Sequence, residues 1–427
     1  MRYCFVVLFV LALACTAAPR ATIAAEFTTT AEQAILIDVG TNTTLFEKNA
    51  DDPGPPASMA KLMTLALLFN ALEKGDVTLE TEFTVSLHAW KTGGAPSRTA
   101  AMFAPLKHQV TVSDLLQGIL VQSANDACII VAEGLAGSET AFADMMTEYG
   151  KKIGLKNTVF KNATGLPDPG NKTTVRDLGL LAMHVIKKHE KYLPQFKQHL
   201  FKYRIHPFYN LNPIIKANIS ADLSRVGFSA DFGAGTVSST VQDGRRLIVV
   251  MNGVKSKKWL QAEEKAENRK RESDEVKGSK FKSSSLRKLK SNTVRLLSWG
   301  YRNFKKYTVF DAGEIVGEAM TWGANKGYVK LRGADNSPVT ILLPINSKKR
   351  RLRGEIAYIG PVKPPVATGD HIGELRVTTS DGISTSAPLE AAESVEKSGI
   401  IRQGTDSLIV LAFGWFIHHQ GSYFKFK

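Results

Sequence analysis

The alternation of hydrophobic and polar positions divides the first part of the chain into short strands and longer helices. The largely apolar residues 34–38, which end at Asp38, and the apolar pair 45–46 flank a Gly-Thr-Asn turn, which predicts two strands. An Asp-Gly pair at 243–244 before residues 246–251, which are apolar after Arg246, predicts a hairpin turn and a further strand. Helical periodicity occupies the intervening chain at 58–72, 112–136, 139–153 and 174–188. This mixture predicts one α+β domain over residues 26–254.

The pattern changes twice beyond residue 254. Residues 255–291 carry thirteen Lys/Arg against six Asp/Glu and few large apolar side chains. They predict a basic insertion, either a solvated helix extension or a flexible segment, in a linker that ends at residue 305. Residues 306–390 alternate in short runs broken by Gly and Pro, which predicts a small β-sandwich domain.

The two ends of the chain differ from these domains. Residues 1–25 combine Arg2, an apolar run and small residues, so they predict a secretory signal peptide cleaved before Glu26 or at a second small-residue site. The tail 391–427 contains an apolar-aromatic run, Leu408–Ile417, that is too short to span a bilayer. That run either lies on the membrane surface or packs on protein. We expect export to the periplasm, free or peripheral on the outer face of the inner membrane.

Composition narrows the classes of partner. The net charge of +15 is compatible with nucleic acid or with an anionic envelope surface. Export and the absence of a basic-aromatic recognition motif favour the envelope surface and exclude nucleic acid. After signal cleavage Cys128 is the remaining cysteine, so no intramolecular disulfide is expected. Its apolar surroundings predict a small buried residue and not a nucleophile. The histidines show no metal-binding spacing, so we expect no metal and no cofactor.

The candidate chemistry begins at the predicted helix 58–72. Ser58 and Lys61 are three residues apart, which brings their side chains to nearly one face of a helix. A serine hydroxyl becomes a nucleophile when a base removes its proton, and a lysine of lowered pKa can be that base. An N-capping serine beside a solvated lysine would give the same pattern.

A second polar cluster interrupts the apolar helix pattern of 112–136. Ser123 and Asn125 follow an apolar run, so a loop there can place a hydroxyl and an amide beside the first pair. Ser123 is predicted to relay a proton and Asn125 to hold a substrate amide. A surface turn or a helix cap would also produce this short motif.

With these two motifs, the sequence resembles the low-molecular-mass penicillin-binding proteins, the serine-type D-Ala-D-Ala carboxypeptidases. The resemblance covers nearly the whole mature chain. It extends beyond the motifs to residues 89–94, 123–127, 136–138, 154–158, 165–167, 243–248, 297–302 and 365–369.

The resemblance implies a serine β-lactamase/transpeptidase-like domain, an antiparallel sheet flanked by helices, followed by a small all-β domain. It implies that Ser58 is the acylated nucleophile, Lys61 the general base, and Ser123 and Asn125 the proton path and substrate grip. The backbone N–H groups of Ser58 and Phe228 would form the oxyanion hole. The substrate would be the peptidoglycan stem peptide, and β-lactams would inhibit.

The third motif of that family, Lys-Thr-Gly, needs careful placement. The sequence Lys91-Thr92-Gly93 precedes Ser123 in the chain, whereas the family motif follows it. The surrounding pattern places the motif at residues 225–229, and the spacing from there to Arg246 fits the family without a gap. We therefore treat residues 91–93 as a coincidental match.

The motif at 225–229 departs from the family. Arg225 keeps the positive charge in a different shape, while Val226 lacks the hydroxyl that would bind the substrate carboxylate. Gly227 preserves a strand open to close backbone approach, and Ser229 keeps a hydroxyl where threonine is usual. The residues predicted to contact substrate here are Arg225, Gly227, Phe228 and Ser229.

Two further carboxylate anchors of the family are missing. The family's Asn-Arg-Asn reads Asn210-Leu211-Asn212, and Trp259-Leu260-Gln261 stands where an arginine is expected. One lost charge-assisted hydrogen bond costs roughly 1.5–3 kcal/mol. A bidentate grip by Arg225 on the carboxylate would compensate.

Three functions fit these residues. The first is a carboxypeptidase that removes the terminal D-alanine through an acyl-enzyme on Ser58. The second is a related acyl enzyme, a DD-endopeptidase or slow β-lactamase. The third is a degenerate penicillin-binding protein that binds peptidoglycan with little turnover. The intact Ser58, Lys61, Ser123 and Asn125 favour the first, and the altered third motif is the observation that favours the third.

Overall fold

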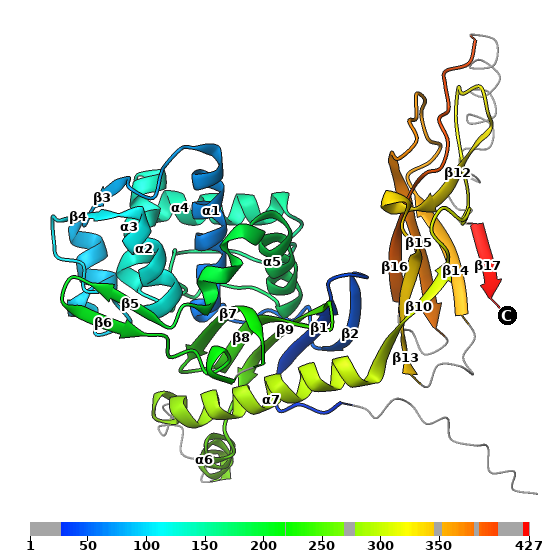
Figure 1. Cartoon of the computed structure of the whole chain (residues 1–427). Coiled ribbons are helices and arrows are strands. Elements are labelled where there is room, and N and C mark those ends of the chain that lie inside the picture. The colour runs from blue at the N-terminus through cyan, green and yellow to red at the C-terminus, as the bar shows by residue number, and fades with distance from the viewer. Residues whose placement is uncertain are drawn as a thin grey trace, which may run out of the picture.

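A computed structural model describes residues 27–217, 219–268, 278–345, 352–379, 384–399 and 422–426. The expected signal peptide and the apolar run Leu408–Ile417 lie outside these residues. Figure 1 shows a larger α+β unit joined through one long helix to an elongated β unit. No helix in the described ranges is long and apolar enough to cross a membrane.

The first unit is built on a five-stranded antiparallel sheet with the order β2-β1-β9-β8-β7. Its strands are β1 (Gln33–Asp38), β2 (Thr43–Lys48), β7 (Ala221–Ser229), β8 (Gly233–Gln242) and β9 (Arg245–Val254). The predicted hairpin at 243–244 is confirmed: Asp243 and Gly244 both have positive φ, 49° and 71°, which suits a tight turn between β8 and β9.

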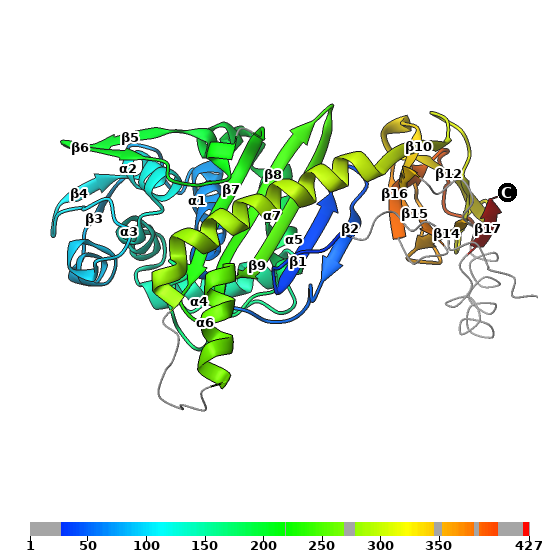
Figure 2. The same ribbon diagram turned by 90° about the horizontal axis from the view of Figure 1, so that it is seen from below.

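Helices cover both faces of this sheet. One layer holds α1 (Lys61–Lys74), α2 (Val112–Gln117), α3 (Asn125–Ala136), α4 (Glu139–Lys152) and α5 (Val175–Lys188). On the opposite face a single helix, α7 (Lys282–Asn303), crosses the strands (Figure 2). Almost every residue of α1 and much of α3 is buried, because these helices lie within the core and not at its surface.

The predicted helix 112–136 is not continuous. It comprises α2, a wide turn at Gly118–Gln122, and α3. Ser123 has a left-handed backbone (φ 56°), in which a right-handed helix cannot continue. The helix therefore ends there, and a new one begins at Asn125. The helix predicted from Ser58 likewise begins as one 3₁₀ turn, Ala57–Ala60, before α1.

The basic segment after β9 is helical where it is described. α6 (Lys257–Asn268) and the first turns of α7 pack beside the end of β7. Trp259 is buried, with its ring 6.0 Å from Phe228 and 5.9 Å from Phe281, so this segment is attached to the domain through an aromatic cluster. Farther along, α7 buries Leu289 and Leu296 against the sheet.

The second unit is all β. β10 (Phe304–Phe310) pairs with β13 (Val339–Pro344), and a six-stranded sheet runs β11-β12-β16-β15-β14-β17. Its strands are β11 (Gly317–Met320), β12 (Tyr328–Gly333), β14 (Leu352–Tyr358), β15 (His371–Thr379), β16 (Ser384–Ala391) and β17 (Ser422–Phe426). The two sheets share one apolar core. Thr43 on β2 donates a hydrogen bond to Thr385 on β16 (2.7 Å), which joins the units.

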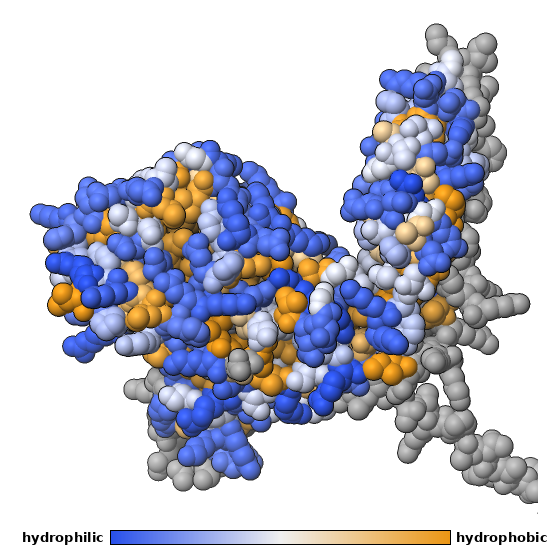
Figure 3. Space-filling model, viewed as in Figure 1, coloured by the Kyte–Doolittle hydropathy of each residue, from blue (hydrophilic) through white to orange (hydrophobic). Residues whose placement is uncertain are grey.

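Two small hairpins complete the first unit. They are β3 (Glu82–Thr84) with β4 (Gln109–Thr111), and β5 (Leu200–Tyr203) with β6 (His206–Tyr209). On the face drawn in Figure 3, hydrophilic side chains cover most of both units, with apolar groups interspersed.

Candidate active site

Ser58 and Lys61 meet at the start of α1. Lys61 is 1% exposed, and its Nζ donates hydrogen bonds to Ser58 Oγ (3.0 Å) and to the carbonyl oxygen of Thr164 (2.7 Å). Burial lowers the pKa of Lys61 to about 8, and the positive charge of Arg225 acts in the same direction. A substantial fraction of this amine is therefore neutral near pH 8 and able to accept the Ser58 proton.

The carbonyl of Thr164 is a contact that the sequence motifs did not indicate. Its loop packs tightly on the turn that carries Ser58: Gly165 has φ 76°, and a Cβ there would lie 1.8 Å from the Ala57 carbonyl oxygen. A glycine is required at this position for both reasons. The Gly165-Leu166-Pro167 segment was noted only as part of a resemblance, since a backbone contact leaves no side-chain signal.

Ser123 and Asn125 flank the break before α3. Asn125 is 4% exposed; its Nδ2 donates to Thr99 Oγ1 (2.9 Å), and its Oδ1 has no hydrogen-bond partner among the described residues. The loop is held by Asp126, whose carboxylate accepts from the backbone N–H groups of Met102 (2.9 Å) and Ala104 (3.1 Å). Asp126, which belongs to the resemblance at 123–127 but was given no role there, is thus a structural residue of this loop.

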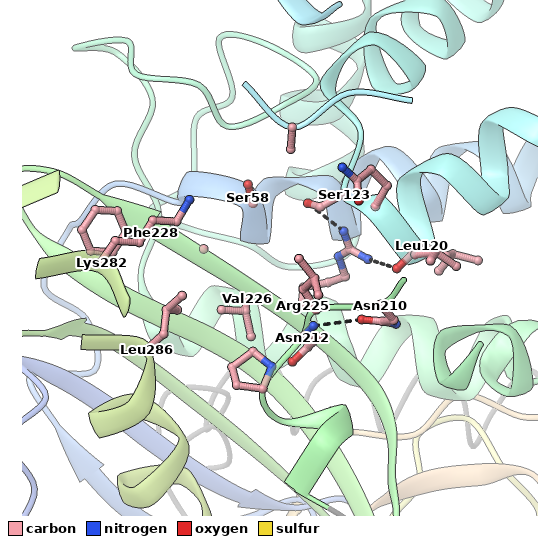
Figure 4. A pocket seen from close by; sticks show the side chains of 16 residues that line it. Ser58, Leu120, Ser123, Asn210, Asn212, Arg225, Val226, Phe228, Lys282 and Leu286 are labelled. Atoms are coloured by element: carbon pink, nitrogen blue, oxygen red, sulfur yellow. Dashed lines mark hydrogen bonds between the residues drawn. The ribbon is translucent and has the colours of Figure 1, made fainter. Parts of the chain in front are cut away.

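Arg225 on β7 points toward this loop. Its guanidinium donates to the carbonyl oxygen of Leu120 (3.1 Å) and to Ser123 Oγ (3.1 Å), as Figure 4 shows, and also to the carbonyl oxygen of Ile119 (2.8 Å). Both terminal nitrogens are therefore committed to the protein, and the bidentate grip on a carboxylate is not the arrangement they adopt. Desolvation lowers the pKa of Arg225 to about 10, so the group remains charged at neutral pH.

The rest of β7 runs beside the backbone of Ser58. A Cβ at Gly227 would lie 2.9 Å from Ala57 Cβ and 3.0 Å from the Ser58 nitrogen, closer than ordinary contact. This approach brings the backbone after Gly227 next to the serine turn. Phe228 packs on Trp259. Ser229 is half-buried, and its hydroxyl accepts a hydrogen bond from the Asp231 nitrogen (3.4 Å).

A pocket of about 270 Å³ opens in front of Ser58 (Figure 4). Most of its walls come from the wide turn before Ser123, from the loop after β6 and from β7. It is lined by Ser58, Ala100, Leu120, Val121, Gln122, Ser123, Asn210, Leu211, Asn212, Pro213, Arg225, Val226, Gly227, Phe228, Lys282 and Leu286. Lys282 and Leu286 belong to α7 and were not among the residues predicted from the motifs.

Neither missing carboxylate anchor is replaced at its own place in the chain. Asn212 Nδ2 donates to Ser224 Oγ (3.0 Å) and Asn210 Nδ2 to the Gln198 carbonyl (3.0 Å), so these amides hold the loop. Leu211 between them is 71% exposed and brings no charge. Trp259 is buried in the aromatic cluster. Cys128 is also buried, and desolvation raises the pKa of its thiol to about 12, which suits the predicted structural residue.

Comparison with known families decides the identity of this site. Residues 20–256 match the model of the D-alanyl-D-alanine carboxypeptidase family, and residues 304–397 match that of the penicillin-binding protein 5 C-terminal domain. This chain belongs to the D-alanyl-D-alanine carboxypeptidase family. The D-alanyl-D-alanine carboxypeptidase DacC of Escherichia coli is 29% identical over 394 residues, covering 92% of this chain and 90% of the relative.

Solved structures share this fold. Penicillin-binding protein 5 from Haemophilus influenzae superposes with a TM-score of 0.68 at 24% identity, covering 87% of this chain and 99% of that one. Penicillin-binding protein D2 from Listeria monocytogenes in its ampicillin-bound form matches with a TM-score of 0.50 at 22% identity, covering 65% and 99%. The predicted fold class and the predicted enzyme class, a serine-type D-Ala-D-Ala carboxypeptidase, are confirmed.

Proposed function

We propose that this carboxypeptidase removes the terminal D-alanine of peptidoglycan stem peptides through an acyl-enzyme on Ser58. The proposal is carried by the buried Lys61 amine, which lies 3.0 Å from Ser58 Oγ. Ser58 in turn lines the pocket. Ser58 Oγ attacks the carbonyl carbon of the last peptide bond while Lys61 takes its proton. The oxyanion is stabilised by the N–H groups of Ser58 and Phe228. The amide bond then breaks, D-alanine leaves with a proton on its amine, and water hydrolyses the ester.

The remaining predicted site residues have supporting roles in this proposal. Ser123 passes the proton to the leaving amine, and Arg225 orients the Ser123 hydroxyl through their 3.1 Å hydrogen bond. Gly227 permits the close approach of β7 to Ser58. Asn125 and Ser229 lie outside the lining of the pocket. Asn125 holds the loop, and we assign its buried, unpartnered Oδ1 to the substrate amide. Ser229 is the last residue of β7, the strand along which the peptide would lie.

Localisation and partners follow the same proposal. The predicted signal peptide would export the chain to the periplasm. There the C-terminal tail would either lie on the membrane surface and hold the protein there, or pack on protein. Inhibition by β-lactams is supported by the ampicillin complex of the structural neighbour D2. The proposed catalytic unit, residues 26–254, and the proposed β unit, residues 306–390, are connected by α7.

A binding role with little turnover is the second candidate. It is favoured by Val226, which offers no hydroxyl to a carboxylate, and by Leu211, which offers no charge. In this case Ser58 would be acylated slowly or not at all. A slow β-lactamase would differ from both, since a β-lactam would be turned over and not retained.

The test is labelling of the mature protein with a fluorescent penicillin, followed by an assay of D-alanine release from a D-Ala-D-Ala peptide. Ser58→Ala should abolish both. Ser113→Ala, which removes a hydroxyl on α2 away from the lining of the pocket, is the matched control and should retain both. Folded wild type that neither labels nor releases D-alanine would establish the binding role, and steady loss of label would indicate β-lactamase activity.

A further inference from the structure

The pocket wall opposite Ser123 is supplied by α7, the helix that follows the basic insertion. Lys282 and Leu286 stand one helical turn apart and line the pocket together with Val226 and Phe228. Figure 4 shows both side chains coming from the helix toward the side of the pocket bounded by β7. A residue far from the motifs in sequence is therefore part of the substrate site.

The start of α7 is held firmly enough to position Lys282. Trp259 stacks on Phe281 and lies against Phe228, which ties the residue before Lys282 to the motif strand. Ser285 is fully buried, and its hydroxyl accepts a hydrogen bond from the Ser256 nitrogen (3.2 Å) at the end of β9. The Lys282 ammonium itself lies 6.0 Å from the centre of the Phe228 ring.

The charges around the pocket leave Lys282 as the available cation. Arg225 is hydrogen-bonded to two carbonyl oxygens and to Ser123. Lys61 is hydrogen-bonded to Ser58 and to the Thr164 carbonyl. Lys282 is exposed and makes no hydrogen bond or ion pair within the described part of the chain. No aspartate or glutamate is among the residues that line the pocket. A carboxylate entering beside Val226 would meet an apolar floor and this one free ammonium.

We propose that Lys282 is a specificity-determining residue that binds the C-terminal carboxylate of the peptide substrate. It takes over from a different element the task that Val226 and Leu211 cannot perform. This inference rests on the proposed function, because it concerns the same pocket. Peptides with a free terminal carboxylate should accordingly be preferred to the same peptides ending in a carboxamide.

The kinetic test compares wild type, Lys282→Ala and Lys282→Arg on one N-acylated peptide ending in D-Ala-D-Ala and on its C-terminal carboxamide. Loss of one partly solvated ion pair should raise KM for the free acid about two- to fivefold with kcat little changed. The carboxamide should be unaffected, and Lys282→Arg should restore most of the affinity. Lys280→Ala, which removes the same charge two residues away outside the pocket lining, is the matched control and should behave as wild type.

A binding test separates this inference from the proposed function. In the Ser58→Ala background, which cannot acylate, affinity for the free-acid peptide is measured by calorimetry with and without Lys282→Ala. The expected result is an about two- to fivefold loss of affinity for the peptide acid and none for the carboxamide. Equal affinities, a similar loss with the carboxamide, or no binding by either protein would overturn the role of Lys282, even if penicillin labelling had already established Ser58.

Discussion

Gly227 offers the most direct test of the proposed oxyanion hole, because its effect is geometric. Gly227→Ala adds one methyl group 2.9 Å from Ala57 Cβ and 3.0 Å from the Ser58 nitrogen. Carbon atoms at rest lie about 3.5–4.0 Å apart, so β7 and the serine turn must separate by roughly 0.5–1 Å. That separation moves the Phe228 N–H away from the position that it must hold relative to Ser58.

The magnitude follows from what one such donor contributes. Removing a single oxyanion-hole hydrogen bond costs about 10²–10³ in rate. We therefore expect the rate of acylation by a fluorescent penicillin, measured by stopped-flow or rapid quench, to fall about a hundredfold. Overpacking at this contact costs about 1–3 kcal/mol of stability, so the melting temperature should fall while the protein remains folded.

A second glycine of the same domain provides the control. Gly40→Ala places its methyl group 3.6 Å from Asp38 Oδ1, an ordinary contact remote from the pocket, and should acylate at the wild-type rate. An acylation rate for Gly227→Ala within about threefold of wild type, in a protein that is folded by circular dichroism, would refute the proposed pairing of Ser58 and Phe228.

Four further predictions concern other parts of the structure. Since Lys61 must be neutral to act as a base and its pKa is about 8, the acylation rate should rise with pH through about 8 and level off above it; a flat profile from pH 6 to 9 would contradict the assignment. The Cys128 thiol, with a pKa near 12 and no exposure, should react with iodoacetamide only after denaturation, which mass spectrometry of native and unfolded samples would show. Arg245→Ala should lower the free energy of unfolding in urea by about 3–5 kcal/mol, because it leaves the buried Asp38 carboxylate without the partner now 2.7 Å away. Combining Arg225→Lys with Val226→Thr should increase D-alanine release; no increase would show that this motif does not limit turnover.

The sequence predicted best those features that depend on local periodicity. The three-residue spacing of Ser58 and Lys61 is a property of helical geometry, and the structure brings their side chains within 3.0 Å. The β7–β9 part of the sheet could be predicted for a similar reason, because an Asp-Gly pair between apolar runs has few alternatives to a hairpin turn.

The polar cluster at Ser123 and Asn125 indicated a loop, but the residue at which the helix ends was harder to place. Apolar residues continue on both sides of the break with a helical period, and a non-glycine residue in the left-handed region carries no signal. The direction of Arg225 depends on this break. The carbonyls of Ile119 and Leu120 at the end of a helical segment need donors, and the guanidinium supplies them.

Lys282 could not be predicted at all. It lies in a run of lysines and serines in which every cation has the same local appearance, and its place in the pocket results from the packing of Trp259 and Phe281. Tertiary contacts between segments distant in sequence decided this residue, as they decided the Thr164 carbonyl.

The long helix α7 sets the distance between the pocket and the β unit. Its first turn borders the pocket and its last turn leads into β10, so the whole 22-residue helix spans about 33 Å between them. The helix contains no proline and is packed along the sheet. The distance between the pocket and the start of the β unit is therefore fixed. Four residues added within the helix would lengthen it by about 6 Å and rotate its end by about 40°, which would change the position of the β unit relative to the pocket.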